Sequence, residues 1–348
     1  MIYNHFRNTD VLVDFCRAYY IPDELTRLSG FHQTYKHFTR SDQNSVTKAY
    51  ICGYSINTLK KHLCIRDFFC SNKVQHLYEI IPALNLYVIK CCEHGKPRSS
   101  LLSIIESIRF FITFLQLKAL QNDTFYYLKR YVKKFAKKAS RKRLGLRQVH
   151  VDKIIKKVEN SKPLSACFYR SYVMIIFMYF TICRFDCASR IQMANIQYHN
   201  EYLDITVPKS KTDQEGNGQK IYLPHKASWS PHRLICSYLH KLGHQEETAF
   251  LFSPLKWDKV CKKWKFNPEK PISYKAAYSG FKRFLIYCDI DCKNFSLHSL
   301  RIGGTTDLFE RRVPGKVIDA KGRWKNKATK HLYNHSKKTI REDILKFA

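Results

Sequence analysis

The sequence contains few acidic residues for its length. Its 348 residues include 28 Asp and Glu against 61 Lys and Arg, which leaves a formal net charge of +33 at pH 7. Such an excess destabilises a folded chain through self-repulsion unless a polyanion neutralises it, and nucleic acid is the usual polyanion. An anionic membrane surface is the alternative, although no basic amphipathic segment stands apart from the globular pattern. The charge balance therefore favours a protein that binds nucleic acid.

Long hydrophobic runs are absent as well. The longest apolar run covers residues 172–183, and crossing a bilayer takes roughly 20 residues. The stretch 101–120 is interrupted by Glu106, Arg109 and Lys118, and the first ten residues lack the apolar segment of an export signal. We therefore expect an intracellular protein without a membrane-embedded part, located in the nucleus if its host is eukaryotic.

The thirteen cysteines lack the short paired spacings of a zinc site. The nearest candidates are Cys183 with Cys187 and Cys288 with Cys292, and the members of each pair stand four residues apart in a helical pattern. We therefore expect reduced thiols that pack as small apolar groups, and no metal site.

The length allows two ordinary domains, and 45% apolar with 26% charged residues is a globular balance. From residue 57 to about 138 the apolar residues recur at helical spacing, as in Leu101, Ile104 and Ile108. We predict an all-helical domain over 46–140, a basic linker over 141–147 and a second domain over 148–348. Residues 1–45 remain an extension without a clear domain.

The second domain mixes two periodicities. An amphipathic helix is expected from Gln148 and a nearly all-apolar helix over about 168–183. The runs YLDITVP and KIYLP then read as strands, and the intervening SKTDQEGNGQ suits a hairpin loop. Helical patterns resume from there to the C-terminus. The predicted fold is therefore mainly α with a small antiparallel β-sheet.

A basic strip ends the helical domain. A helix over about 125–139 would place lysines and an arginine on two adjacent rows, with the apolar Leu128, Tyr131, Val132 and Phe135 opposite. This strip consists of Lys129, Arg130, Lys133, Lys134, Lys137 and Lys138, and it continues through Arg141, Lys142 and Arg143. We expect it to contact DNA phosphates. A solvated helix face is the alternative, and the last three residues could equally serve nuclear import.

The C-terminal third carries a set of residues suited to phosphoryl chemistry. Breaking a DNA phosphodiester without a metal needs a nucleophile, cations around the phosphate and an acid for the leaving 5′ oxygen. The segments LHSLRIGG, KGRW and KHLYNH supply His298 and Arg301, then Trp324, then Tyr333. On a helix, His298 and Arg301 share one face.

These segments resemble the tyrosine recombinase (phage integrase) superfamily. Its pattern is His-x-x-Arg, then a His or Trp, then a nucleophilic Tyr nine residues later, which is the spacing from Trp324 to Tyr333. The segment CRFDCASRIQMANI resembles the one that holds the family's first arginine, here Arg184. The SKTD segment matches the position of its mobile catalytic lysine, here Lys211, with Lys209 as the alternative.

The resemblance implies a mechanism without a metal or nucleotide cofactor. Tyr333 would form a 3′-phosphotyrosyl link with double-stranded DNA, and Lys211 would protonate the 5′ oxygen. The phosphate would be held by Arg184, His298, Arg301 and Trp324. The helical core-binding domain and the catalytic domain would close around the DNA, and the C-terminal tail would dock on a neighbouring subunit of a tetramer.

Two positions depart from the family's pattern or from helix propensity. Cys187 stands where the family commonly has an acidic residue, so that Asp186, a water molecule or nothing takes over its support. Gly303 and Gly304 lower helix propensity by roughly 1 kcal/mol each, which a close approach of the helix to DNA or to another helix would justify.

The sequence from His298 to Trp324 is most similar to those of the recombinases of eukaryotic mobile elements, the Cryptons and DIRS-like retrotransposons. This similarity suggests an integrase that joins element DNA to a chromosome. The alternatives are a type IB topoisomerase and a catalytically silent, domesticated DNA-binding protein.

Overall fold

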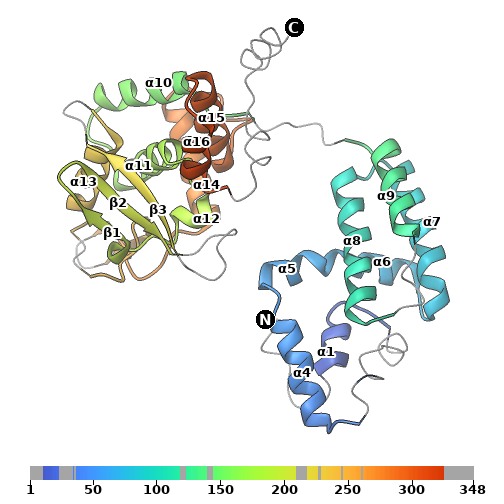
Figure 1. Cartoon of the computed structure of the whole chain (residues 1–348). Helices are drawn as coiled ribbons and strands as arrows, with labels where there is room; N and C mark the ends of the chain where they lie inside the picture. The colour runs from blue at the N-terminus through green and yellow to red at the C-terminus, as the bar shows by residue number, and fades with distance from the viewer. Residues whose placement is uncertain are drawn as a thin grey trace. The chain divides into compact units, whose positions relative to one another are not determined.

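The computed structural model describes residues 11–22, 34, 37–117, 123–138, 144–208, 218–225, 229–243, 246–259 and 262–324. The chain forms two compact units, residues 1–140 and 141–348 (Figure 1). Each unit has a hydrophobic core of its own. The predicted fold class, mainly α with a small antiparallel sheet, is confirmed.

The first unit consists of helices and their connecting turns, with no strand among its described residues. Its α-helices are α1 (Val11–Arg17), α4 (Arg40–Cys52), α5 (Ile56–Lys61), α6 (Ile65–Asn72), α7 (Ile80–Glu93), α8 (Arg98–Phe114) and α9 (Thr124–Phe135). In α8 the residues Leu101, Ile104 and Ile108 are buried, as their helical spacing predicts. That buried face lies against α9, α6 and α7.

The first described helix belongs to this core. The ring centre of Phe15 in α1 lies 5.2 Å from that of Phe114, and the ring centre of Tyr19, in the turn after α1, lies 4.7 Å from that of Phe111. The Tyr19 hydroxyl also donates a 2.8 Å hydrogen bond to the carbonyl of Leu59. Residues 11–21, which the sequence left without a domain, therefore pack as part of the helical unit.

The second unit is built around a buried central helix. Its helices are α10 (Gln148–Glu159), α11 (Ala166–Phe180), α12 (Phe185–Ala188), α13 (Pro231–Leu242), α14 (Tyr274–Tyr287), α15 (Leu297–Glu310) and α16 (Gly315–Gly322). The helix α11 is buried on all sides because α13, α14 and α15 pack against it. A nearly all-apolar helix of this kind is typical of a domain core.

Local sequence explains where these helices begin and end. In α13, the Ser230 side chain accepts from the backbone N–H of Arg233 and Pro231 occupies the first turn, both typical of a helix start. Gly243 follows the last residue with φ = +61°, the left-handed conformation that glycine adopts readily.

A three-stranded antiparallel sheet contains the predicted hairpin. The strands are β1 (Ile196–Tyr198), β2 (Tyr202–Val207) and β3 (Gln219–Pro224), in the order β1-β2-β3 (Figure 1). Leu203 and Ile205 pair with Leu223 and Ile221 across β2 and β3, and all four are buried. Alternate residues of the strands thus cover the core.

A second hairpin was not predicted. The sequence reading had helical patterns continuing beyond residue 224, but β4 (Leu255–Asp258) and β5 (Lys263–Phe266) form a two-stranded antiparallel ribbon. Each strand is only four residues long, too short for its alternation of apolar and polar residues to stand out from the surrounding sequence. The helical assignment was therefore wrong for residues 255–266.

Among the described residues, every helix is too short or too polar to span a membrane.

Candidate active site

A cleft in the second unit joins two of the predicted catalytic residues. Arg184 and His298 both line it, together with Cys183, Phe185, Asp186, Tyr274 and Leu297, and its volume is about 280 Å³. Arg184 is the cap residue of α12, whereas His298 lies in the first turn of α15 and Tyr274 begins α14. Helix N-termini carry a partial positive charge, so the ends of α14 and α15 add to the attraction of an anion.

Arg301 lies one helical turn after His298 and is fully buried. Its guanidinium donates hydrogen bonds to the carbonyls of Ile182, at 2.5 Å, and Gly322, at 2.8 Å. The guanidinium carbon also lies 4.4 Å from the ring centre of Trp324. These carbonyls and the aromatic ring orient the group without contributing a negative charge.

A strained turn supplies the first of these carbonyls. Ile182 follows the end of α11 and has φ = +45°, a left-handed conformation that is rare for a β-branched residue. Such strain persists only where surrounding structure enforces it, and it concentrates at functional sites. Here it turns the Ile182 carbonyl toward Arg301 and brings the next residues, Cys183 and Arg184, into the cleft.

The position of Trp324 depends on the glycine two residues before it. A Cβ atom at Gly322 would lie 2.0 Å from the Trp324 ring, so only glycine leaves room for that ring. Trp324 is 8% exposed and packs with Ile182 and Ile318. The indole therefore forms part of a small apolar cluster beside Arg301 rather than projecting into solvent.

The glycine pair on α15 allows two close approaches. A Cβ atom at Gly303 would lie 1.8 Å from the carbonyl oxygen of Leu146, and one at Gly304 would lie 2.4 Å from that of Tyr179. Gly304 therefore faces another helix, α11, which is one of the two alternatives that the sequence left open. Gly303 faces the segment that leads into α10, a neighbour the sequence did not predict.

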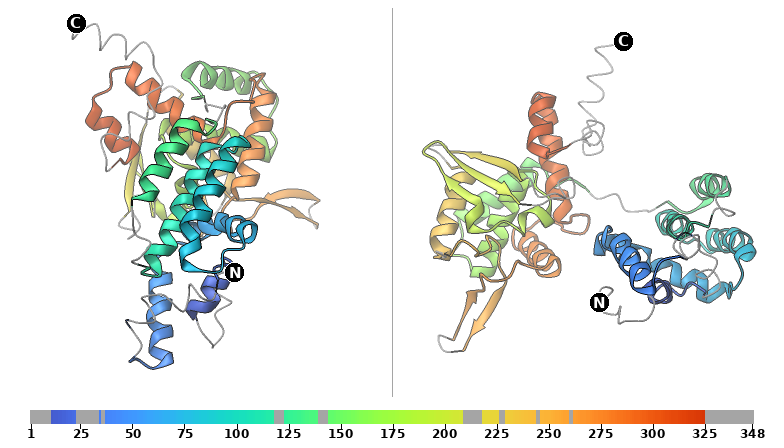
Figure 2. Two further views of the ribbon diagram at one scale, coloured as in Figure 1. Left: turned by 90° about the vertical axis from the view of Figure 1, so that its right-hand side faces the viewer. Right: turned by 60° about the horizontal axis from the view of Figure 1, so that its bottom comes forward.

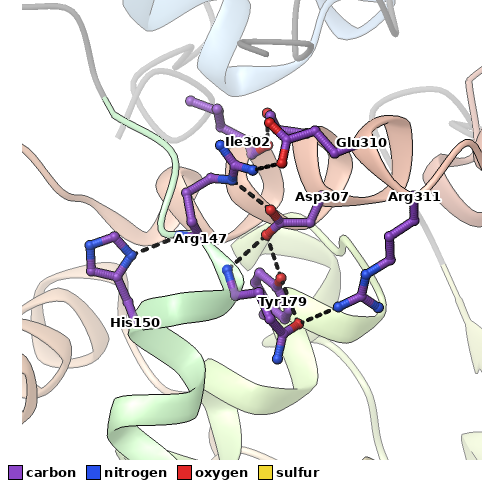
Figure 3. Close-up of polar contacts among 9 residues, drawn as sticks. Arg147, His150, Tyr179, Ile302, Asp307, Glu310 and Arg311 are labelled. Atoms are coloured by element: carbon purple, nitrogen blue, oxygen red, sulfur yellow. Dashed lines mark hydrogen bonds and ion pairs between the residues drawn. The ribbon is translucent and has the colours of Figure 1, made fainter. Parts of the chain in front are cut away.

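A buried carboxylate ties the same helix to its surroundings (Figure 3). Asp307 accepts hydrogen bonds from Arg147 Nε at 2.6 Å, from the backbone N–H of Gln148 at 2.9 Å and from the Tyr179 hydroxyl at 2.5 Å. Arg147 also pairs with Glu310. Burial, followed by the hydrogen bond to Asp307, raises the pKa of Tyr179 well above its ordinary value. The network joins α15 to α11 and to the start of α10.

The charges of three arginines converge on a buried thiol. A hydrogen bond with Cys187 is the largest cause that lowers the pKa of the Cys183 thiol. The positive charges of Arg323, Arg301 and Arg184 lower it further. Cys187, at the position where an acidic residue was expected, is thus buried beside Cys183. The neighbouring Asp186 is exposed and lines the cleft with Arg184.

Sequence reasoning missed two of these residues. Asp307 lies six positions after Arg301, in a helix whose other residues from Leu297 to Thr306 are nearly all buried, and its acidic side chain among them was a signal of a polar network. Arg323 directly precedes Trp324 and is 9% exposed. It showed no signal of its own, because a single arginine in a chain with 61 basic residues does not stand out.

The basic strip is described in part. Lys129 forms a 2.5 Å ion pair with Glu106, and its side chain is only 22% exposed. The strip residues Arg130, Lys133, Lys134, Lys137 and Lys138 are exposed. Leu128 and Val132 are buried as expected, but Phe135 is 58% exposed, contrary to its predicted place on the apolar face.

Several predicted site residues lie outside the described residues. They are Tyr333, Lys211, its alternative Lys209, and Arg141, Lys142 and Arg143 of the strip. The described part of the predicted catalytic set is therefore Arg184, His298, Arg301 and Trp324. Of these, Arg184 and His298 line the cleft, whereas Arg301 and Trp324 stack on each other.

Comparison with solved structures shows one shared fold. The XerH site-specific recombinase bound to palindromic difH substrate matches with a TM-score of 0.55 at 14% identity, over 97% of each chain. The Tn1549 transposon integrase in complex with transposon right end DNA matches with a TM-score of 0.62 at 10% identity, over 92% of this chain and 98% of that one. A lambda integrase dimer bound to a COC′ core site gives 0.57 at 15%, over 86% and 96%.

Sequence comparison locates the shared region. No curated protein matches the chain in sequence. The model of the phage integrase family, however, matches residues 145–339, more than half of the chain. That range contains the cleft, the α15 network and the positions of Lys211 and Tyr333. The chain therefore belongs to the phage integrase family, the tyrosine recombinases.

Proposed function

We propose that this protein is an active site-specific DNA recombinase of a mobile element, which cuts and rejoins double-stranded DNA through a 3′-phosphotyrosyl bond to Tyr333. The observation that carries the proposal is the cleft that Arg184 and His298 both line, with Arg301 buried one helical turn after His298. Membership of the family and the DNA-bound state of XerH, lambda integrase and the Tn1549 integrase support it.

The cleft has the chemistry that a scissile phosphate requires. Arginine stays charged and can grip two phosphate oxygens at once, which suits the developing charge of a pentacovalent phosphorus. Arg301 is fully buried and donates to the carbonyls of Ile182 and Gly322, so holding a phosphate would require it to exchange one of these hydrogen bonds for the phosphate. Arg184 and His298, which line the cleft, would contact the phosphate directly.

Each assigned residue has one role in this mechanism. The Tyr333 oxygen attacks phosphorus, the bond to the 5′ oxygen breaks, and Lys211, or Lys209 in its place, donates the proton to that oxygen. Arg184, His298 and Arg301 hold the phosphate, with Trp324 against Arg301. The phosphotyrosyl bond conserves the energy for religation, so the cycle needs no cofactor.

We propose that the basic strip tracks the DNA backbone. Its exposed members from Arg130 to Lys138 present side chains to solvent on one helix and its extension, the arrangement that phosphate contacts need. Arg141, Lys142 and Arg143 would continue this contact between the two units. Lys129 is the weakest member, because Glu106 already compensates its charge.

Two finer assignments, the type of mobile element and the assembly on DNA, complete the proposal. The similarity of residues 298–324 to Crypton and DIRS-like recombinases supports an integrase of a eukaryotic mobile element, which would act in the nucleus. A tetramer on paired DNA sites is the assembly that this chemistry requires if two duplexes exchange strands.

The test is a covalent protein–DNA adduct. Nicked suicide duplexes taken from the DNA that flanks the coding region should trap the wild-type protein in a denaturation-resistant complex. Tyr333→Phe should bind the same duplexes and form none, since it lacks only the attacking oxygen. An adduct with the Phe variant would show that another residue is the nucleophile.

The two alternative functions give other outcomes. A type IB topoisomerase would relax a supercoiled plasmid that lacks any recombination site, because it needs no partner site. A catalytically silent DNA-binding protein would bind every duplex and form no adduct even as wild type.

A further inference from the structure

We propose that the hairpin of β4 and β5 is a second DNA-binding element, a β-ribbon that enters a groove of the duplex beyond the cleft. The inference rests on the proposed function, because it takes DNA as the ligand. The hairpin projects from the second unit (Figure 2), and none of its residues is among those that line the cleft.

The cross-strand register divides the ribbon into two faces. Leu255 pairs with Phe266, Lys256 with Lys265 and Trp257 with Trp264. Because side chains alternate along a strand, the two tryptophans share a face with Leu255 and Phe266, and the paired lysines lie on the other. The ribbon is therefore apolar on one side and basic on the other.

The apolar face of the ribbon begins at the core of the second unit and extends from there into solvent. Phe266 packs edge-on against Tyr238, which is buried in the core of the second unit. Trp257 and Trp264 lie further out, 45% and 58% exposed. Their rings contact one another at 5.5 Å, a pair that stabilises the hairpin. Large aromatic surfaces left in water in this way are typical of a binding site.

The basic face also calls for a ligand. Like charges directly opposite each other destabilise an antiparallel pair, and here Lys256 stands opposite Lys265. Asp258 pairs with Lys265 at 2.6 Å, but it is the single acidic residue of the ribbon, whose sequence from 255 to 266 holds five lysines. The exposed Lys259 and Lys262 place further charge near the tip.

Duplex DNA fits both faces at once. The major groove admits a two-stranded ribbon, whose lysines meet the phosphates while aromatic rings contact sugars and thymine methyl groups. A protein partner would use the tryptophans and leave the lysines without a role. Another copy of this chain, with a net charge of +33, would be repelled by them. The combination therefore favours DNA.

Binding of the full-length protein to a mixed-sequence duplex of about three helical turns, measured across a salt series, tests the assignment. Lys256→Gln with Lys262→Gln should make the negative slope of log K against log salt shallower by about 1.8, because two phosphate contacts are lost. Trp257→Ala with Trp264→Ala should weaken binding on the order of tenfold, as loss of buried aromatic contacts does, with the slope unchanged.

Control variants separate DNA contact from other causes. Lys156→Gln with Lys162→Gln removes the same charge from exposed positions near α10 and should leave the slope unchanged. Trp257→Phe with Trp264→Phe keeps the aromatic pair and should retain most of the affinity. Because the lysine variant leaves the tryptophan pair intact, its result does not depend on whether the alanine variant keeps the hairpin folded.

The outcomes distinguish this inference from the proposed function. If the hairpin variants bind the duplex like the wild type, the ribbon is not a DNA-binding element. If they bind single duplexes normally but fail to pair two of them, the ribbon binds protein and the assignment to DNA is wrong. If the wild type itself binds no duplex, the proposed function fails first.

Discussion

Among the described glycines, Gly303 has the least room for a side chain. The carbonyl oxygen of Leu146 occupies the place where a side chain would begin, and neither backbone can move without shifting α15 or the segment before α10. Leu146 is also bound there by its own N–H, which donates to the carbonyl of Ser299 at 2.9 Å. The residue thus fixes the helix that carries His298 and Arg301.

Gly303→Ala should therefore destabilise the protein, although alanine favours a helix by about 1 kcal/mol over glycine. Overpacking of a buried site costs about 1–3 kcal/mol, and here the obstacle is backbone. Gly280→Ala is the matched control, since its Cβ would come too close only to the hydroxyl oxygen of Ser171, at 2.7 Å, which can rotate away if it releases its hydrogen bond to the Cys167 carbonyl. Urea unfolding measures both, and equal midpoints would contradict the packing argument.

At the residue scale, the sequence predicted catalytic residues through their resemblance to a family motif. The structure brings two of them, Arg301 and Trp324, into contact, and the catalytic roles of His298, Arg301 and Trp324 stay predictions. Asp307 could not be assigned, because its role depends on Arg147 and Tyr179, which are 160 and 128 positions away in the chain. Contacts between distant residues depend on the fold and leave no local pattern.

Among the helices, α15 depends on the Asp307 network for its attachment to α11 and α10. Asp307→Asn removes the charge that Arg147 pairs with while keeping the shape of the side chain. Breaking a buried ion pair costs about 3–5 kcal/mol, and the partial exposure of Arg147, at 31% of its side chain, lowers our expectation to about 2 kcal/mol. The free energy of unfolding in urea measures this loss.

Glu310→Gln provides the comparison for Asp307. Glu310 pairs with the same arginine, but its side chain is 34% exposed. Ion pairs in contact with water contribute at most about 1 kcal/mol, so this variant should lose much less stability. Equal losses in the two variants would mean that burial does not determine the strength of the network.

The basic strip on α9 allows a test of single charges. Lys133→Gln should make the negative slope of log K for DNA against log salt shallower by about 0.9, the value for one phosphate contact. Lys129→Gln should change the slope less, because Lys129 already pairs with Glu106 at 2.5 Å. A slope unchanged by Lys133→Gln would show that this side of α9 faces solvent in the complex.

Elements with a long, clear periodicity were the predictable ones. The apolar spacing of α8 and the alternation of β2 and β3 each extend over enough residues to be read. The ribbon of β4 and β5 was not predicted, because its strands are short and its tryptophans are exposed, whereas large apolar residues in a strand are expected to be buried. Phe135 was predicted to lie on the apolar face of its helix, but the structure leaves its side chain exposed to solvent.

At the scale of the whole molecule, the two units have separate cores, and a charge of +33 opposes association of one chain with another. DNA would remove that obstacle by neutralising the charge, so we expect a monomer in solution and assembly on DNA. The segment after Tyr333 lies outside the described residues, and its sequence is the basis for the last prediction.

The C-terminal tail should join subunits rather than stabilise its own. Ile340, Ile344, Leu345 and Phe347 recur near helical spacing, on a segment too short to form a core by itself. Such a segment must dock, either on its own unit or on a neighbouring one. If it docks on a neighbour, deleting residues 339–348 leaves the thermal transition and the binding of one duplex unchanged, but weakens the pairing of two duplexes in a gel-shift assay. If it docks on its own unit, the deletion lowers the melting temperature, because buried apolar surface is lost. The charge argument favours the first result, since a tail that docks only after DNA has neutralised its neighbour would couple synapsis to binding.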